Sequence, residues 1–221
     1  MINNKTFAFQ GVKGAYSELA GYSLYPNHQS FPCKTFEEMF LSVKNKKADL
    51  AIVPIENSKA GRVADTQRLI PESKLKIIGE YFLEVNHCLL ASHSTNLDNI
   101  KRIHSHEQAI TQCRNNIIKH NKEMVVAADT AGAAKMVSEL NNTEDAAIAS
   151  QLAADTYNLK IIQNSFQDSE KNITRFLIMS NSKEIPDVNI KDLMTTLVFE
   201  LKSIPAALYK SLGGLASNGV N

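Results

Sequence analysis

The feature that most constrains the fold is an alternation of short β-rich runs with helical patterns. Strands are expected at residues 5–9, 50–53, 102–105, 123–127 and 145–148, and a helical pattern follows each of them. Strands separated by helices usually form parallel-rich sheets with helices packed on both faces. The sequence therefore predicts an α/β protein.

A few residues set the boundaries of individual elements. Thr35 and Glu38 form a capping-box pattern that starts a helix. Pro71 is expected to end a helix that begins near residue 63. Further strands are expected at residues 76–90 (with a bend midway), 160–166 and 175–180.

The composition describes an ordinary globular protein and argues against several classes of function. With 221 residues, one large domain or two smaller ones are expected, and 43% hydrophobic residues suffice for a real core. A formal net charge of +1 gives no general attraction to nucleic acid, and we interpret the lysine cluster at 44–47 as a solvated helix end. No stretch reaches the roughly 18 apolar residues of a membrane span.

The cysteines and the first residues both indicate a cytoplasmic protein. Cys33, Cys88 and Cys113 are odd in number and far apart, which fits reduced, buried thiols better than a disulfide framework. The N-terminal residues lack the apolar core of a secretion signal. A cytoplasmic location is therefore expected.

Four polar segments each lie at the carboxyl end of an expected strand, next to a helix start, where open α/β sheets place their ligands. The first, residues 11–17, has two glycines that allow a tight turn and ends in Ser17, although such turns are also common in ordinary folds. The second, residues 54–63, reads Pro-Ile-Glu-Asn-Ser-Lys-Ala-Gly-Arg-Val. Its amides could bind a carboxylate, and a plain loop capped by Asn57 and Ser58 is an equal alternative.

The third segment, residues 104–109, reads His-Ser-His-Glu-Gln-Ala. No second pair of ligands with metal-site spacing accompanies its histidines, so a strand end is preferred over a metal site. Ser105 is expected to cap the following helix, with Gln108 as its capping-box partner. The fourth segment, residues 172–178, opens with Asn-Ile-Thr-Arg-Phe and, taken alone, also fits an edge strand with exposed polar residues.

In order and spacing, the four segments resemble the prephenate dehydratase family. Its members show a glycine-turn opening, a Pro-Ile-Glu-Asn-Ser loop, a Ser-His-x-Gln-Ala turn and a Thr-Arg-Phe strand, and the match runs from about residue 5 to residue 180. Supporting matches are Glu80 and the runs at 87–90, 127–134 and 146–150. The family usually has Gly-Thr-Phe-Ser where this chain has Gly-Ala-Tyr-Ser at 14–17, which leaves Ser17 as the candidate there.

The resemblance implies a domain organisation. Residues 1–180 would form a two-lobed catalytic region like the type II periplasmic binding proteins, with the active site in the cleft. Lobe one would hold about residues 1–77 and 164–180, and lobe two about residues 78–163. Residues 181–193 look like a linker. After it, one strand is expected at residues 195–201 and a helix at about residues 206–217. Residues 194–221 resemble the N-terminal part of an ACT domain, a ferredoxin-like α+β regulatory module that is incomplete here.

The resemblance also implies a reaction that needs no cofactor, the conversion of prephenate into phenylpyruvate, water and carbon dioxide in phenylalanine biosynthesis. Thr174 would be the catalytic hydroxyl, donating a hydrogen bond to the ring hydroxyl that leaves. Alternation along a strand could turn Arg175 away from Thr174, and Glu56, awkward beside a dianion, could be structural. The substrate-binding residues would be Ser17, Glu56, Asn57, Ser58, Ser105, Gln108, Asn172, Arg175 and Phe176.

Several alternatives stay open from the sequence alone. Arogenate dehydratases perform the same chemistry on the transaminated substrate, and a non-catalytic protein that binds a small carboxylate would share the architecture. Weak or no feedback by L-phenylalanine is expected, because the later part of the ACT module is missing from the sequence. A homo-oligomer, dimer or tetramer, is expected if that module is completed, and no metal, nucleic acid or membrane partner is expected.

Overall fold

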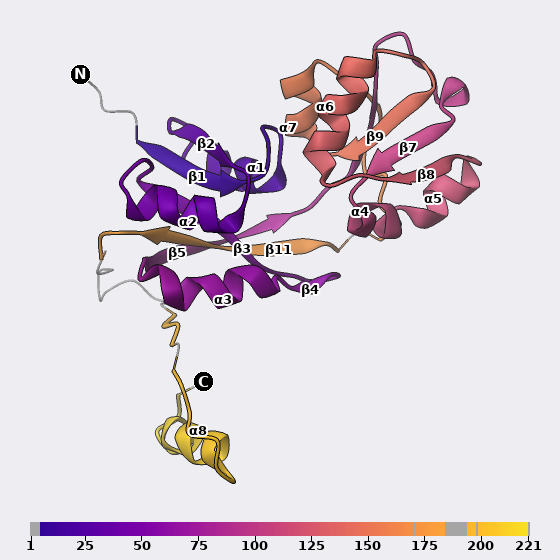
Figure 1. Cartoon of the computed structure of the whole chain (residues 1–221). Helices are drawn as coiled ribbons and strands as arrows, with labels where there is room; N and C mark the ends of the chain where they lie inside the picture. Colours follow the sequence, from indigo (N-terminus) through magenta and orange to yellow (C-terminus); the bar gives the residue numbers. More distant parts are fainter. Residues whose placement is uncertain (1–4, 170, 184–193, 198, 221) are drawn as a thin grey trace. The chain divides into compact units, whose positions relative to one another are not determined.

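The computed structural model describes residues 5–169, 171–183, 194–197 and 199–220. The chain divides into two units, Met1–Ile185 and Pro186–Asn221. The first unit holds two separate β-sheets, each with helices on both faces (Figure 1). This confirms the expected α/β class and the expected arrangement in two lobes.

The first sheet is mixed. Its strand order is β2 (Gln29–Cys33), β1 (Thr6–Gln10), β3 (Leu50–Asn57), β11 (Ile173–Ser180) and β5 (Lys76–Glu84), and β4 (Gly61–Arg62) pairs with β3. β1 runs parallel to β2 and β3, whereas β11 runs antiparallel to β3 and β5. The prediction of parallel-rich sheets was therefore too simple, because β11 returns from the second lobe in the opposite direction.

Alternation along the strands builds one hydrophobic core on each face of the first sheet. Ala51 and Val53 of β3 pack on the side of α2 (Phe36–Lys44) and α3 (Ala64–Ser73). Leu50 and Ile52 of the same strand pack on the side of α1 (Tyr16–Leu24). Side chains two residues apart share a face, so one apolar strand serves both cores.

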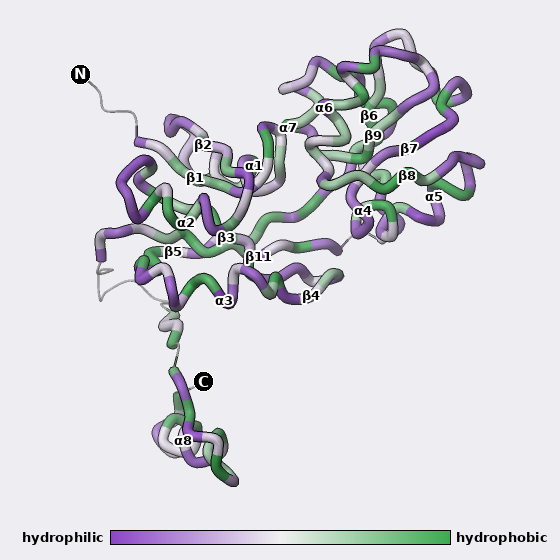
Figure 2. The backbone as a smooth tube through the Cα atoms, in the orientation of Figure 1, coloured by the Kyte–Doolittle hydropathy of each residue, from purple (hydrophilic) through white to green (hydrophobic). Residues whose placement is uncertain are grey.

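The second sheet has the order β10 (Lys160–Gln163), β6 (Cys88–Ala91), β9 (Asp145–Ala149), β7 (Arg102–Ser105) and β8 (Glu123–Val126). One face is covered by α4 (Glu107–Gln112) and α5 (Arg114–Lys119), the other by α6 (Thr130–Leu140) and α7 (Gln151–Tyr157). A 3-10 helix, η1 (Leu97–Asn99), precedes β7. Figure 2 shows hydrophobic residues along β6 and β9, which lie inside this sheet and are buried.

Two chain segments connect the sheets, one between β5 and β6 and one between β10 and β11. They are hydrogen-bonded to each other, since the Val85 N–H donates to the Asn172 carbonyl at 2.7 Å and the Phe166 N–H donates to the His87 carbonyl at 2.7 Å. Residues 76–90 therefore form two strands in two sheets instead of one bent strand. β5 also extends the first sheet beyond residue 77, to Glu84.

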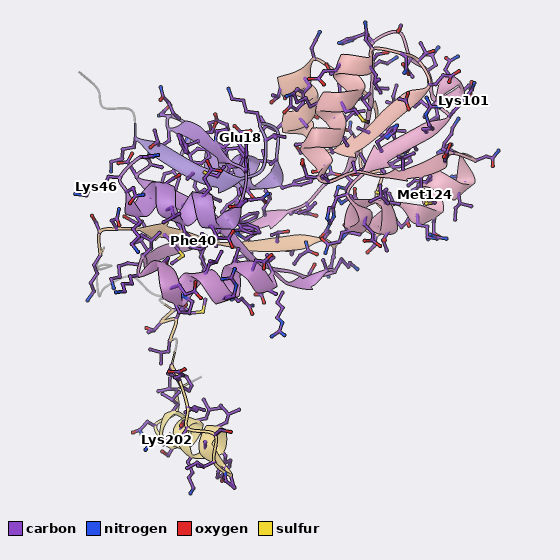
Figure 3. All side chains as sticks on the ribbon, viewed as in Figure 1. Glu18, Phe40, Lys46, Lys101, Met124 and Lys202 are labelled. Atoms are coloured by element: carbon purple, nitrogen blue, oxygen red, sulfur yellow. The ribbon has the colours of Figure 1, made fainter. Side chains whose placement is uncertain are left out.

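Other local expectations agree with the structure in part. The Glu38 N–H donates to Thr35 Oγ1 at 3.1 Å, as a capping box requires. Pro71 lies inside the last turn of α3 instead of ending it, where its missing N–H removes one backbone hydrogen bond at most. Residues 44–47 are exposed at the end of α2, as expected of a solvated helix end, and Figure 3 labels Lys46 there.

The second lobe contains a buried ionic cluster. The Asp145 carboxylate, whose residue is 2% exposed, accepts from Arg102 Nε at 2.7 Å and from Arg102 Nη2 at 2.8 Å. It also accepts from His104 Nε2 at 2.6 Å and from Asn142 Nδ2 at 2.8 Å. These partners, Arg102 first, hold the pKa of Asp145 well below its usual range.

The second unit contains α8 (Ala207–Ser217), close to the helix expected there. The strand expected at residues 195–201 is not formed in the described residues 194–197 and 199–201. A single strand has no ladder to join unless another strand lies beside it. Most of the expected linker lies outside the described residues, and the resemblance of residues 194–221 to an ACT domain stays a prediction.

Two further observations concern the chain as a whole. All three cysteines are buried and free, as expected. None of the helices in the described ranges is long and apolar enough to cross a lipid bilayer.

Candidate active site

A cleft of about 250 Å³ opens between the two sheets of the first unit. It brings together at least one residue from each of the four polar segments of the sequence. The lining residues that were identified from the sequence are Ser17, Asn57, Gln108, Asn172, Thr174 and Phe176.

Strand alternation decides which side chains of β11 reach the cleft. Thr174 and Phe176 are two residues apart and both line it. Arg175 lies between them and projects to the opposite face of the sheet, where its guanidinium contacts Glu80 at 2.8 Å and Glu56 at 3.3 Å. It also lies over the Phe82 ring, 5.7 Å from the centroid.

A bulge in β3 brings Asn57 to the same side as Pro54. Arg175 pairs with Glu56 and Phe176 pairs with Pro54, so Ile55 is an extra residue in the ladder. Without that extra residue, side chains three positions apart would face opposite sides of the sheet. Both Pro54 and Asn57 line the cleft as a result.

Ser58 and Ser105, two predicted substrate-binding residues, form hydrogen bonds with the backbone instead of lining the cleft. The Ser58 hydroxyl accepts from the Ile173 N–H at 2.9 Å, which ties the loop after β3 to the start of β11. Ser105 is fully buried at the end of β7 and donates to the Ile148 carbonyl at 2.6 Å. Because that hydroxyl is engaged in the sheet, His106 caps α4, accepting from the Gln108 N–H at 3.3 Å.

The Thr174 hydroxyl is held by Asn57. Oδ1 of Asn57 accepts from the backbone N–H groups of Lys59 and Ala60, both at 2.9 Å, which directs its amide nitrogen into the site. That nitrogen donates to Thr174 Oγ1 at 2.8 Å and to Asn172 Oδ1 at 2.7 Å. Among the residues that the structure describes, no protein group accepts from the Thr174 hydroxyl, so its proton is left for a ligand.

Several lining residues were not singled out from the sequence. They are Tyr16, His87, His106, Gln112, Asp129 and Thr130. Each lies within or beside a motif that had been recognised, but only the folded chain shows which neighbours turn inward. His87 and Gln112 come from different segments, one before β6 and the other at the end of α4.

The cleft carries little formal positive charge. In the part of the chain that the structure describes, its lining includes Asp129, His87 and His106 but no lysine or arginine. Burial lowers the pKa of His87, which favours the neutral ring. Burial also raises the pKa of Tyr16, which stays protonated. An anionic ligand in this cleft would therefore be bound mainly by hydroxyl, amide and backbone N–H donors.

The loop before α1 is fastened to the second lobe. The Ser150 hydroxyl donates to the Gly14 carbonyl at 2.6 Å, and the Tyr157 hydroxyl donates to the Lys13 carbonyl at 2.7 Å. Gly14 has a φ of +86°, and a Cβ there would lie 2.8 Å from Ala153 Cα. Glycine allows this close approach, which fixes the start of α1 and Ser17 at the cleft.

A cleft between two α/β lobes, lined by neutral polar groups, is typical of proteins that bind a small organic ligand. Comparison with known protein families identifies which class of protein this is. The sequence profile of the prephenate dehydratase family matches residues 7–184. This chain belongs to the prephenate dehydratase family.

Individual relatives agree with this assignment. A bifunctional N-acyl-homoserine lactone acylase/prephenate dehydratase from Komagataeibacter europaeus is 43% identical over 221 residues, covering 100% of this chain and 79% of the relative. The Arabidopsis thaliana arogenate dehydratase/prephenate dehydratase 2 is 40% identical and covers 97% of this chain. The chain spans 56% of that plant protein.

A solved structure shows that the likeness extends to the fold. The prephenate dehydratase from Arthrobacter aurescens, crystallised in complex with L-Phe, superposes with a TM-score of 0.86 at 29% sequence identity. The superposition covers 97% of this chain and 73% of the other.

Proposed function

We propose that this chain is a prephenate dehydratase, a carbon–oxygen lyase that forms phenylpyruvate in phenylalanine biosynthesis. The observation that carries the proposal is the Thr174 hydroxyl in the cleft wall, whose oxygen accepts from Asn57. No protein group among the described residues accepts its proton, which can therefore be donated to a substrate. Membership of the family over residues 7–184 supports it.

The reaction breaks two bonds of prephenate. The bond from the ring to its carboxylate breaks, carbon dioxide leaves, and the electron pair enters the ring as it becomes aromatic. The bond from the ring to its hydroxyl breaks on the opposite carbon, and hydroxide leaves. Thr174 donates a hydrogen bond to the departing oxygen, and a proton from solvent completes the water.

The hydrogen bond from Thr174 is best described as positioned stabilisation. A threonine hydroxyl is a weak acid, so full proton transfer contributes little, whereas a preoriented donor at a developing negative charge is effective. The hydrogen bond from Asn57 to Thr174 Oγ1 withdraws electron density from that oxygen. The Thr174 O–H group becomes a stronger hydrogen-bond donor as a result. Aromatisation supplies much of the driving force.

The remaining contacts follow from the lining of the cleft. Ser17, Gln108 and Asn172 would orient the substrate, and Phe176 would pack against its ring. Asn57 would act mainly on Thr174, because both hydrogens of its amide nitrogen already have partners. Glu56, Ser58, Ser105 and Arg175 are left out of the substrate contacts, since their side chains serve the opposite sheet face or the backbone.

The test is a direct assay for product. Purified protein is incubated with prephenate, the reaction is quenched under conditions that preserve unreacted prephenate, and the absorbance of phenylpyruvate is read. Product formation above the uncatalysed rate is the expected result. Folded protein that binds prephenate but forms no phenylpyruvate would instead indicate a carboxylate-binding protein.

One observation favours arogenate as a second candidate substrate. Asp129 lines the cleft, and its lining in the described ranges holds no lysine or arginine to balance that charge. Arogenate carries an ammonium group where prephenate carries a ketone, so Asp129 could pair with it. Comparing kcat/KM for prephenate and arogenate decides between them.

Replacement of Asp129 by asparagine tests that pairing. Asp129 Oδ1 caps α6 by accepting from the Gly132 N–H at 2.6 Å, and asparagine keeps an oxygen for this role. If Asp129 recognises the ammonium group, the substitution lowers kcat/KM for arogenate by about 10-fold to 100-fold and changes the value for prephenate by less than about threefold. Equal effects on both substrates would count against a role in choosing between them.

A further inference from the structure

A chain of hydrogen-bonded side chains runs from α1 to Thr174 through two residues to which no function has been assigned. The Tyr16 hydroxyl lies 2.7 Å from His87 Nδ1, and His87 Nε2 lies 2.9 Å from Gln112 Oε1. Asn172 Nδ2 donates to the same Gln112 oxygen at 2.7 Å. Asn172 then accepts from Asn57, which donates to Thr174.

The donor and the acceptor of each hydrogen bond in this series can be assigned, starting from Asn57. The backbone amides of Lys59 and Ala60 fix which end of the Asn57 amide is oxygen. Asn57 then donates to Asn172 Oδ1, so Asn172 turns its nitrogen toward Gln112 Oε1. An amide oxygen cannot donate, so His87 must carry its proton on Nε2.

The other side of the His87 ring is also satisfied. With the proton on Nε2, Nδ1 accepts from the Tyr16 hydroxyl at 2.7 Å, and that hydroxyl shares its hydrogen with the Asn86 carbonyl, which lies farther away at 3.0 Å. The Tyr16 and His87 rings meet edge to face at 5.5 Å. The His87 backbone is held as well, since its N–H donates to Gln167 Oε1 at 2.9 Å and its carbonyl accepts from the Phe166 N–H at 2.7 Å. His87 is only 3% exposed and Asn172 only 2%.

We propose that His87 and Gln112 are positioning residues for the reaction proposed above. By donating to Gln112, His87 fixes the carbonyl that orients Asn172, and Asn172 and Asn57 together set the direction in which the Thr174 hydroxyl donates. The inference rests on the proposed dehydratase function and adds residues outside the four polar segments. Both ring nitrogens of His87 are occupied by protein groups, so it acts through its neighbours and not on the substrate.

The central test compares two replacements of His87. Phenylalanine keeps a ring of similar size but removes the donor to Gln112, whereas glutamine places an amide N–H where Nε2 was. His87→Phe is expected to lower kcat by about 10-fold to 100-fold with KM changed less than about threefold, because a misdirected catalytic group costs rate more than binding. His87→Gln is expected to restore kcat to within about fivefold of wild type.

A double-mutant cycle separates this role from general damage to the fold. Gln112→Leu removes the shared acceptor and should lower kcat as His87→Phe does. The double variant should lose little more than the larger single loss, because breaking either link interrupts the same chain. His93→Phe, an exposed histidine that contacts Asn158, is the matched control and should leave kcat within about twofold.

A measurement that needs no activity completes the test. NMR of protein with 15N-labelled histidine should show His87 as the neutral ring with its proton on Nε2 at pH 7.5. A proton on Nδ1 alone would overturn the proposal, as would multiplicative losses in the double variant or a His87→Phe enzyme with unchanged kcat. Wild-type protein that forms product from neither prephenate nor arogenate would refute the proposed function itself, which is a different result from any of these.

Discussion

Replacing Thr174 with valine is expected to lower kcat by about 100-fold to 10,000-fold, the range that one positioned donor or general acid contributes. Valine has nearly the same shape but lacks the hydroxyl, so the departing ring oxygen loses its hydrogen bond. The Asn57 amide also loses one of its two acceptors. The loss should appear in kcat with little change in KM, because the interaction matters most as charge develops.

Thr174→Ser is the matched control for this prediction. Serine keeps the hydroxyl and removes only a methyl group, so kcat should stay within about tenfold of wild type. Steady-state rates of phenylpyruvate formation give both values, and a thermal melt checks that each variant is folded. A valine variant with wild-type kcat would remove Thr174 from the mechanism.

Replacing Asp145 with asparagine is expected to destabilise the second lobe by about 2–3 kcal/mol. This is less than the roughly 3–5 kcal/mol that breaking a fully buried ion pair costs, because the Arg102 side chain is 37% exposed and solvent screens part of the interaction. Four donors converge on this carboxylate, from Arg102 Nε and Nη2, His104 and Asn142. An amide has only one oxygen and would turn N–H groups toward some of those donors. Urea unfolding monitored by circular dichroism measures the change.

Glu144→Gln provides the neighbouring control. Glu144 pairs with Lys101 at 2.6 Å, but both side chains are largely exposed, 43% and 66%. Solvent screens such a pair, so its loss should change stability by less than about 1 kcal/mol. Similar destabilisation by both substitutions would show that burial of Asp145 is not what matters.

The same cluster predicts how stability depends on pH. The pKa of the Asp145 carboxyl is lowered in the folded state, chiefly by its hydrogen bonds with Arg102. The unfolded chain therefore binds a proton at this carboxyl at a higher pH than the folded chain does. The contribution of Asp145 is therefore complete above the unfolded value of about 3.9 and is lost as pH falls below it. The difference in stability between wild type and Asp145→Asn should shrink below about pH 4.

Much of the fold could be predicted from local patterns. The runs at residues 50–53 and 146–148 are apolar and each became a buried strand, because such runs leave water most easily in a sheet covered on both faces. The segment at 76–90 was misjudged as one strand, since apolar periodicity cannot show that the chain leaves one sheet and enters another. The strand expected at 195–201 had the right residues but no partner among those described.

The candidate site, like the fold, could be predicted from the sequence only in part. The sequence by itself determined the four polar segments, because residue types and their order are properties of the chain. The resemblance of those segments to the prephenate dehydratase family, and not residues 172–176 alone, singled out Thr174. Only the tertiary structure decided which side chains share the cleft. The bulge at Ile55 places Asn57 beside Thr174, and alternation along β11 turns Arg175 to the opposite face of the sheet. The segment that connects β5 to β6 carries His87 to Gln112 at the end of α4. These are consequences of register and of contacts between distant segments, which no local pattern encodes.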